Sequence, residues 1–252
     1  MTKPVLLCLH GWGGSKESFT ELRTALAGSD VEILTPDLPG FGAEPEPPKP
    51  WTTDDYADWV AQWLRNELKA HGSLPSSLLL LGHSHGGRIA IKLASRRSAF
   101  DSPITHLYLC AAAGVKHRKG TRELLGLWAS KAGGAFLSLP GLKALAPFAR
   151  KTLYKLLRSH DYERASPLMR ETLKRVTEED VRPLLHHIAA PTDIFWGTLD
   201  RMTPVKDAHI LHSAIRGSHL HLFPGSRHRI HRDHAHEIAA VIRKHLHVSP
   251  MS

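Results

Sequence analysis

The sequence is poor in cysteine and has no long apolar run, and each shortage excludes a class of protein. Only two cysteines, Cys8 and Cys110, occur among 252 residues, which excludes a disulfide-stapled scaffold. Both fall in expected buried strands with another strand between them, about 9–10 Å apart, too far for a disulfide. No apolar stretch approaches the roughly 20 residues that a membrane span needs.

Features of secretion and of nucleic-acid binding are also missing. Residues 1–5 lack the charged, apolar and cleavage regions of a signal peptide, so we expect a cytoplasmic location. The formal net charge is +9, but the basic residues are spread along the chain and accompany no nucleic-acid motif. We therefore expect neither a membrane nor a nucleic acid as partner.

What is present is an alternation of short apolar runs and amphipathic stretches. With 42% hydrophobic and 23% charged residues, the chain has an ordinary globular composition. Strands are expected at 5–9, 31–35, 78–81, 105–111, 192–196 and 219–223. Helices are expected at 19–26, 53–68, 85–95, 204–215 and 233–245. This order predicts an α/β fold, a mostly parallel sheet of about six strands with helices on both faces.

One stretch, residues 115–188, breaks the alternation because its pattern is helical throughout. We predict that it is a helical cap, or lid, inserted into a core formed by residues 1–114 and 189–252. Such an insert would cover the carboxyl edge of the sheet, where open α/β sheets bind ligands. Its candidate pocket or core residues are Leu124, Leu125, Leu127, Trp128, Phe136 and Phe148.

The most informative motif follows the apolar run at 78–81. Residues 82–86 read Gly-His-Ser-His-Gly, the G-x-S-x-G pattern that displays a serine on a sharp turn between a strand and a helix. Gly82 and Gly86 are expected because a Cβ at either position would crowd that turn. Ser84 is thus the candidate nucleophile, and it requires a base and an orienting acid elsewhere in the chain.

Candidates for both partners follow late strands. Asp200 lies in the loop after the strand at 192–196 and is the expected acid, whereas Asp193 is near the start of that strand, at the wrong edge. His228 is the first histidine beyond the last strand and is the expected base. His231 and His234 remain alternatives if the loop is longer.

The oxyanion hole needs two backbone N–H groups, each contributing roughly 3 kcal/mol to lowering the barrier. One is expected from His85, after the nucleophile, and the other from Trp12 in the glycine-rich loop 10–15. That loop lacks the G-K-[ST] ending of a phosphate-binding P-loop. The histidines at 228–236 match no common zinc signature, so no metal or cofactor is expected.

Together these segments resemble the α/β-hydrolase superfamily, in its group of esterases, lipases and C–C hydrolases. The matching stretches are His-Gly-Trp-Gly at 10–13, Pro-Asp-Leu-Pro-Gly-Phe-Gly at 36–42, the serine motif at 82–87, Trp-Gly-Thr-Leu-Asp at 196–200 and Gly-Ser-Arg-His at 225–228. The resemblance implies a Ser84–Asp200–His228 triad with oxyanion donors at Trp12 and His85. The chain departs from the family pattern in three ways: it lacks the first two strands, it has His85 after the serine, and it has Arg227 before the expected base.

The expected function is that of a carboxylesterase acting on small to medium hydrophobic esters through an acyl-enzyme intermediate. Thioesterase, lactonase and C–C hydrolase activities remain alternatives on the same triad, and dehalogenases and epoxide hydrolases are disfavoured because they use Asp as nucleophile. The alternative from another functional class is a non-catalytic binding protein of the same fold. Such a protein is expected to lack part of the triad, whereas all three triad residues are present here. The sequence does not indicate the oligomeric state or the natural substrate.

Overall fold

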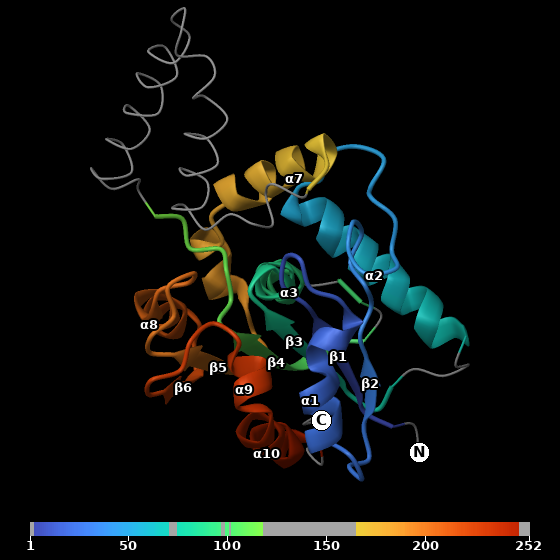
Figure 1. Ribbon diagram of the computed structural model, residues 1–252. Coiled ribbons are helices and arrows are strands. Elements are labelled where there is room, and N and C mark those ends of the chain that lie inside the picture. The colour runs from blue at the N-terminus through green and yellow to red at the C-terminus, as the bar shows by residue number, and fades with distance from the viewer. Residues whose placement is uncertain (1–2, 71–74, 97–98, 101, 118–164, 247–252) are drawn as a thin grey trace, which may run out of the picture.

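The computed structural model describes residues 3–70, 75–96, 99–100, 102–117 and 165–246. They form one six-stranded parallel sheet with the strand order β2-β1-β3-β4-β5-β6 (Figure 1). The strands are β1 (Val5–Leu9), β2 (Glu32–Leu34), β3 (Leu78–His83), β4 (Ile104–Cys110), β5 (Thr192–Gly197) and β6 (His219–Phe223). The predicted α/β class and strand number are therefore confirmed.

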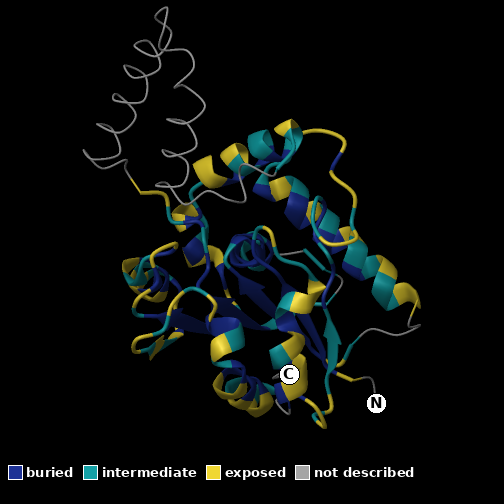
Figure 2. Cartoon of the chain, in the orientation of Figure 1, coloured by how far each residue is buried: buried dark blue, intermediate teal, exposed yellow. Residues whose placement is uncertain are grey.

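The strands form where the sequence is most continuously apolar. Every residue of β1 and of β3 is buried, as expected for strands covered on both faces. The edge strands β2 and β6 are more exposed, and Figure 2 shows burial concentrated in the middle of the sheet. Cys8 and Cys110 lie on β1 and β4 with β3 between them, both buried and unpaired.

Helices cover both faces of the sheet (Figure 1). On one face α1 (Thr20–Ala25) packs against α10 (Ala235–His245), next to the short helices η1 (Lys16–Phe19) and α9 (Ile230–Asp233). On the other face lie α2 (Thr53–Ala70), α3 (His85–Ser95) and α8 (Val205–Ala214). Among the described residues, no helix combines the length and the apolar character that crossing a membrane would demand.

The described part of the expected cap is helical and packs on the core. It comprises α7 (Pro167–Glu178) and η3 (Arg182–His187). Ser166 caps α7 by accepting a hydrogen bond from the Met169 N–H, and Pro167 follows at the first helical position. Thr172 accepts a hydrogen bond from the Trp51 N–H at 3.1 Å, and η3 contacts α3. The cap candidates between 124 and 148 lie outside the described residues, so the predicted domain boundaries stay a prediction.

The crossing of α3 over β1 is so close that only glycine fits. A Cβ on Gly86 would lie 2.0 Å from the Leu9 carbonyl oxygen, and one on Gly82 would lie 2.4 Å from the Gly86 carbonyl oxygen. Both obstacles are backbone atoms, which cannot rotate away. The two glycines of the serine motif are therefore a steric requirement for starting α3 directly after β3.

We expect Gly86→Ala to lower the free energy of unfolding by about 3 kcal/mol or more, because β1 or α3 must move to admit the methyl group. The matched control is Gly217→Ala, where nothing lies within 4 Å of the added Cβ although φ is +69°. That change should cost about 1 kcal/mol from backbone strain alone. Urea unfolding of both variants checks this, and equal losses would contradict the steric argument.

Candidate active site

Ser84 occupies a strained turn between β3 and α3. Its φ of 51° and ψ of −112° place a non-glycine residue outside the favoured regions. Three backbone hydrogen bonds hold it there: its N–H donates to Cys110, and its carbonyl accepts from Arg88 and Ala113, at 3.1, 3.1 and 2.9 Å. The side chain is thereby presented beyond the carboxyl end of β3, as expected for the serine motif.

Asp200 and His228 are brought together from the loops after β5 and β6. The His228 Nδ1–H donates to Asp200 Oδ2 at 2.7 Å, and the N–H groups of Met202 and Thr203 donate to Oδ1 at 2.8 and 3.1 Å. Burial alone would raise the pKa of Asp200, but these hydrogen bonds and the charge of His228 lower it. Asp200 is therefore an ionised acceptor that fixes the ring orientation of His228.

Thr203 is a supporting residue that the sequence analysis missed. Its hydroxyl lies 2.8 Å from Asp200 Oδ2 and 3.2 Å from the Ala111 carbonyl, and its own carbonyl accepts from Trp196 Nε1 at 2.8 Å. It therefore ties the acid loop to both β4 and β5. The available signal was its position three residues after an aspartate, which is typical of a side-chain-capped turn.

His83, at the end of β3, links that strand to the loop of His228. Its Nε2–H donates to the backbone carbonyl of His228 at 3.1 Å, and its ring lies 3.8 Å, centre to centre, from that of His231. Burial, reinforced by His231 and His228, lowers the pKa of His83 well below its ordinary value. His83 is consequently a neutral hydrogen-bond donor, and the sequence showed it only as an unexplained polar residue beside the serine.

The glycine-rich loop is held by His10. The Leu38 N–H donates to His10 Nε2 at 2.9 Å, so Nδ1 carries the proton and donates to the Gly11 carbonyl at 2.8 Å. Trp12 packs edge-to-face against Phe41. These contacts fix the loop next to the serine turn, where a Cβ on Gly11 would lie 3.2 Å from Ser84 Cβ.

His85, the other expected oxyanion residue, begins α3. Within the described residues, neither its N–H nor that of Trp12 donates a hydrogen bond, so both remain available for an incoming anion. The His85 ring lies edge-to-face between Trp12 and Tyr56, and burial lowers its pKa well below the ordinary value. His85, which departs from the family pattern, is thus a neutral ring packed between two aromatic side chains. Arg227, the other departure, is exposed.

Ser84 and His228 both line a cleft of about 1200 Å³. Trp12, Leu173 and Met202 also line it. Charged and titratable side chains continue along its wall, namely Glu17, Glu21, Arg229, Arg232, Asp233 and His236. The described part of the cleft is therefore more polar than the expectation of a hydrophobic pocket implied.

The alternative acid and bases make other contacts, although His231 lines the same cleft as Ser84 and His228. Asp193 is the second residue of β5, at the opposite end of that strand from Asp200. His231 lies in α9 with its ring edge against Phe19. His234 bonds to Ser226 Oγ at 2.7 Å and to Glu237 at 2.9 Å. None of the three makes a hydrogen bond to Ser84, Asp200 or His228 within the described chain.

Buried neutral histidines make the fold sensitive to acid. Burial lowers the pKa of His231 to about 3 and also lowers those of His10, His83 and His85. The unfolded chain binds protons at these positions below about pH 6.5, whereas the folded chain does not. The stability that depends on these neutral rings should therefore be complete above that pH. As the pH drops to 5, the free energy of unfolding should fall by up to about 1.4 kcal/mol per pH unit for each such histidine.

Urea unfolding at pH 7.5 and pH 5.0 measures this dependence. His231→Phe keeps an aromatic ring against Phe19 but removes the titrating group, so its free energy of unfolding should depend less on pH than that of the wild type. An identical pH dependence in the two proteins would show that His231 is not held neutral.

The sequence is similar to a known protein family and to proteins named as esterases. A family model described as the alpha/beta hydrolase family matches residues 6–241. A pimeloyl-[acyl-carrier protein] methyl ester esterase of Chromobacterium violaceum is 30% identical over 255 residues, covering 96% of this chain and 94% of that protein. An enzyme of the same name from Neisseria meningitidis is 28% identical, covering 93% and 90% of the two chains.

Among solved structures, an esterase from Exiguobacterium antarcticum superposes with a TM-score of 0.71 at 21% identity, covering 98% of this chain and 93% of that one. The enol-lactonase from Burkholderia xenovorans gives 0.69 at 18% identity, with 98% and 92% coverage. These two likenesses concern the fold. The family match spans nearly the whole sheet and both loops of the candidate site, and the chain therefore belongs to the alpha/beta hydrolase family.

Proposed function

We propose that this protein is a serine hydrolase that cleaves carboxylic esters through an acyl-enzyme intermediate. The observation that carries the proposal is the 2.7 Å bond between His228 Nδ1 and the ionised Asp200 carboxylate, with His228 on the same cleft as the strained Ser84. An acid–base pair on the same cleft as a partly exposed serine is what activation of a weak hydroxyl nucleophile requires.

In the proposed reaction, Ser84 Oγ attacks the ester carbonyl while His228 Nε2 accepts its proton. Asp200 keeps the proton of the neutral ring on Nδ1 and stabilises the imidazolium that forms. His228 then protonates the leaving alcohol, and water repeats the sequence to release the acid. Among the described residues Ser84 and His228 do not share a hydrogen bond. In substrate-free active sites this bond often forms only when the substrate binds.

The oxyanion of the tetrahedral intermediate would be bound by the N–H groups of Trp12 and His85. Both groups are free of other partners in the described chain, and the His85 N–H also lies at the start of α3, where the helix dipole favours negative charge. Such preorganised donors act on charge that appears only in the transition state.

The proposed substrates are small to medium esters, with the stretch 115–188 acting as a helical cap over the cleft. The relatives from Chromobacterium violaceum and Neisseria meningitidis carry the name of methyl ester esterases, which favours an ester over a thioester, lactone or C–C bond. The apolar residues Trp12, Leu173 and Met202 line the same cleft as Ser84 and suit a hydrophobic group of the substrate. No cofactor takes part in these steps.

Replacing the nucleophile tests the mechanism. We expect Ser84→Ala to lower kcat for a short-chain p-nitrophenyl ester by about 10⁴-fold or more, because no other group supplies the attacking oxygen. Equal rates for variant and wild type would refute the serine mechanism. Absence of turnover by the wild type on a panel of esters would favour a thioester, lactone or C–C substrate, or a binding protein.

A pair of matched substitutions tests the acid. Asp200→Asn should lower kcat by about 10³-fold or more, because the amide no longer enforces the His228 tautomer. Asp193→Asn makes the same chemical change at the far end of β5 and should keep far more activity. The opposite order of the two rates would reassign the acid.

A further inference from the structure

A second cluster of histidines surrounds Asp193 at the edge of the sheet opposite the candidate active site. Asp193 Oδ2 accepts from His106 Nε2 at 2.7 Å, and Oδ1 accepts from His221 Nε2 at 2.6 Å. The ring of His245, the last residue of α10, stacks on that of His106 at 3.8 Å between centres. These residues come from β4, β5, β6 and α10, and they do not contribute to the proposed hydrolysis.

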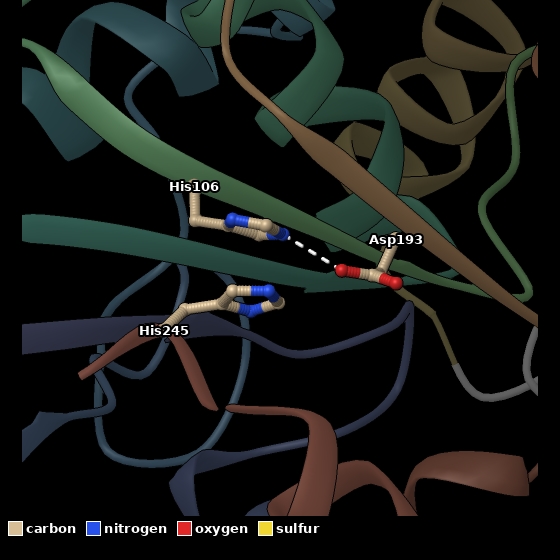
Figure 3. Close-up of side chains that lie close together, drawn as sticks. All are labelled: His106, Asp193 and His245. Carbon is tan, nitrogen blue, oxygen red and sulfur yellow. Dashed lines mark hydrogen bonds and ion pairs between the residues drawn. The ribbon is translucent and has the colours of Figure 1, made fainter. Parts of the chain in front are cut away.

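One ligand atom from each of His106, Asp193 and His245 lies within 4.8 Å of the other two. Figure 3 shows the two rings beside one another and the carboxylate facing them. His106 and Asp193 are buried, and His245 is partly exposed, so the group is sheltered and still has a route to solvent. Within the described residues, it is the one group of three such side chains close enough to share an ion.

In two of these side chains, His245 and Asp193, one polar atom already has a hydrogen-bond partner outside the group of three. Tyr108 Oη lies 3.0 Å from His245 Nδ1, and within the described residues Nε2 of His245 makes no hydrogen bond. His221 occupies the second oxygen of Asp193, which leaves Oδ2 turned to His106. Outer hydrogen bonds of this kind orient the ligands of protein metal sites.

We propose that His106 Nε2, His245 Nε2 and Asp193 Oδ2 form a binding site for one Zn²⁺ or a similar borderline divalent ion. Two imidazoles and one carboxylate suit Zn²⁺, Co²⁺ or Ni²⁺, whereas Mg²⁺ and Ca²⁺ prefer oxygen ligands. The ion takes the place of the proton on His106 Nε2 that Asp193 now accepts, and the ring stays neutral by carrying its one proton on Nδ1. Water completes the coordination.

The fit requires small movements. Ligand atoms of a tetrahedral Zn²⁺ site lie about 3.3 Å apart, so the 2.7 Å contact between His106 and Asp193 must open slightly. The stacked rings, now 16° from parallel, must tilt to aim both nitrogens at one ion. His245 can supply that tilt because it is partly exposed and ends its helix. The bound ion would then join β4, β5 and α10, a structural role separate from catalysis.

Isothermal titration of chelator-treated full-length protein with ZnCl₂ tests the site, with Co²⁺ absorption as a second probe of the coordination geometry. The wild type should bind one ion per chain and unfold at a higher temperature with Zn²⁺ than without. His245→Gln should weaken this binding by about 100-fold, and Tyr108→Phe, which removes only the outer hydrogen bond, by about 10-fold. The matched control is His209→Gln on the exposed face of α8, which should bind like the wild type.

Two results would overturn the proposal. If His245→Gln and Tyr108→Phe both bind Zn²⁺ as the wild type does, the ion sits on other histidines of this histidine-rich chain. If the wild type takes up no ion, the cluster is a hydrogen-bonded network only. Circular dichroism without metal shows whether each variant is folded. If His245→Gln does not fold, Tyr108→Phe still tests the site, because it leaves all three ligands in place.

Discussion

The contact on which the candidate site depends is the approach of the first turn of α3 to the carbonyl end of β1. Gly86 faces the Leu9 carbonyl with no room for a methyl group, and this lets the helix start immediately after the strand. The chain must then turn within one residue, which forces Ser84 to its unusual φ and ψ. Strain at this serine follows from how tightly the helix sits on the sheet.

Hydrogen bonds between loops hold the remaining groups at the same edge. Thr203 joins the acid loop to β4 through the Ala111 carbonyl, and His83 joins β3 to the loop of His228. The loop of Trp12 is fixed in turn by His10 and Leu38. Each of these bonds links segments far apart in the sequence, so the geometry of the site is a property of the assembled sheet.

Much of this arrangement could be predicted from the sequence because its signals are local. The apolar runs mark the strands, and the expected bounds of β1, β6 and α3 agree with the structure at both ends. The order of the serine motif, Asp200 and His228 along the chain places all three after strands of a parallel sheet. His228 was preferred over His231 and His234 because it is the first histidine after the last strand, and the family resemblance implied the same choice.

Other features depend on contacts that a single sequence does not reveal. The roles of Thr203 and His83 arise from hydrogen bonds across the sheet. The cluster around Asp193 draws on four elements, so no spacing of its residues along the chain marks it. The short helices η1 and α9 have too few residues to show a period.

The neutral state of His10, His83 and His85 has a consequence for what a substrate meets. Although histidines surround the serine, these three present fixed dipoles in place of titrating charges. The contribution of these three rings to the electrostatic potential around Ser84 is thus nearly constant across the neutral range.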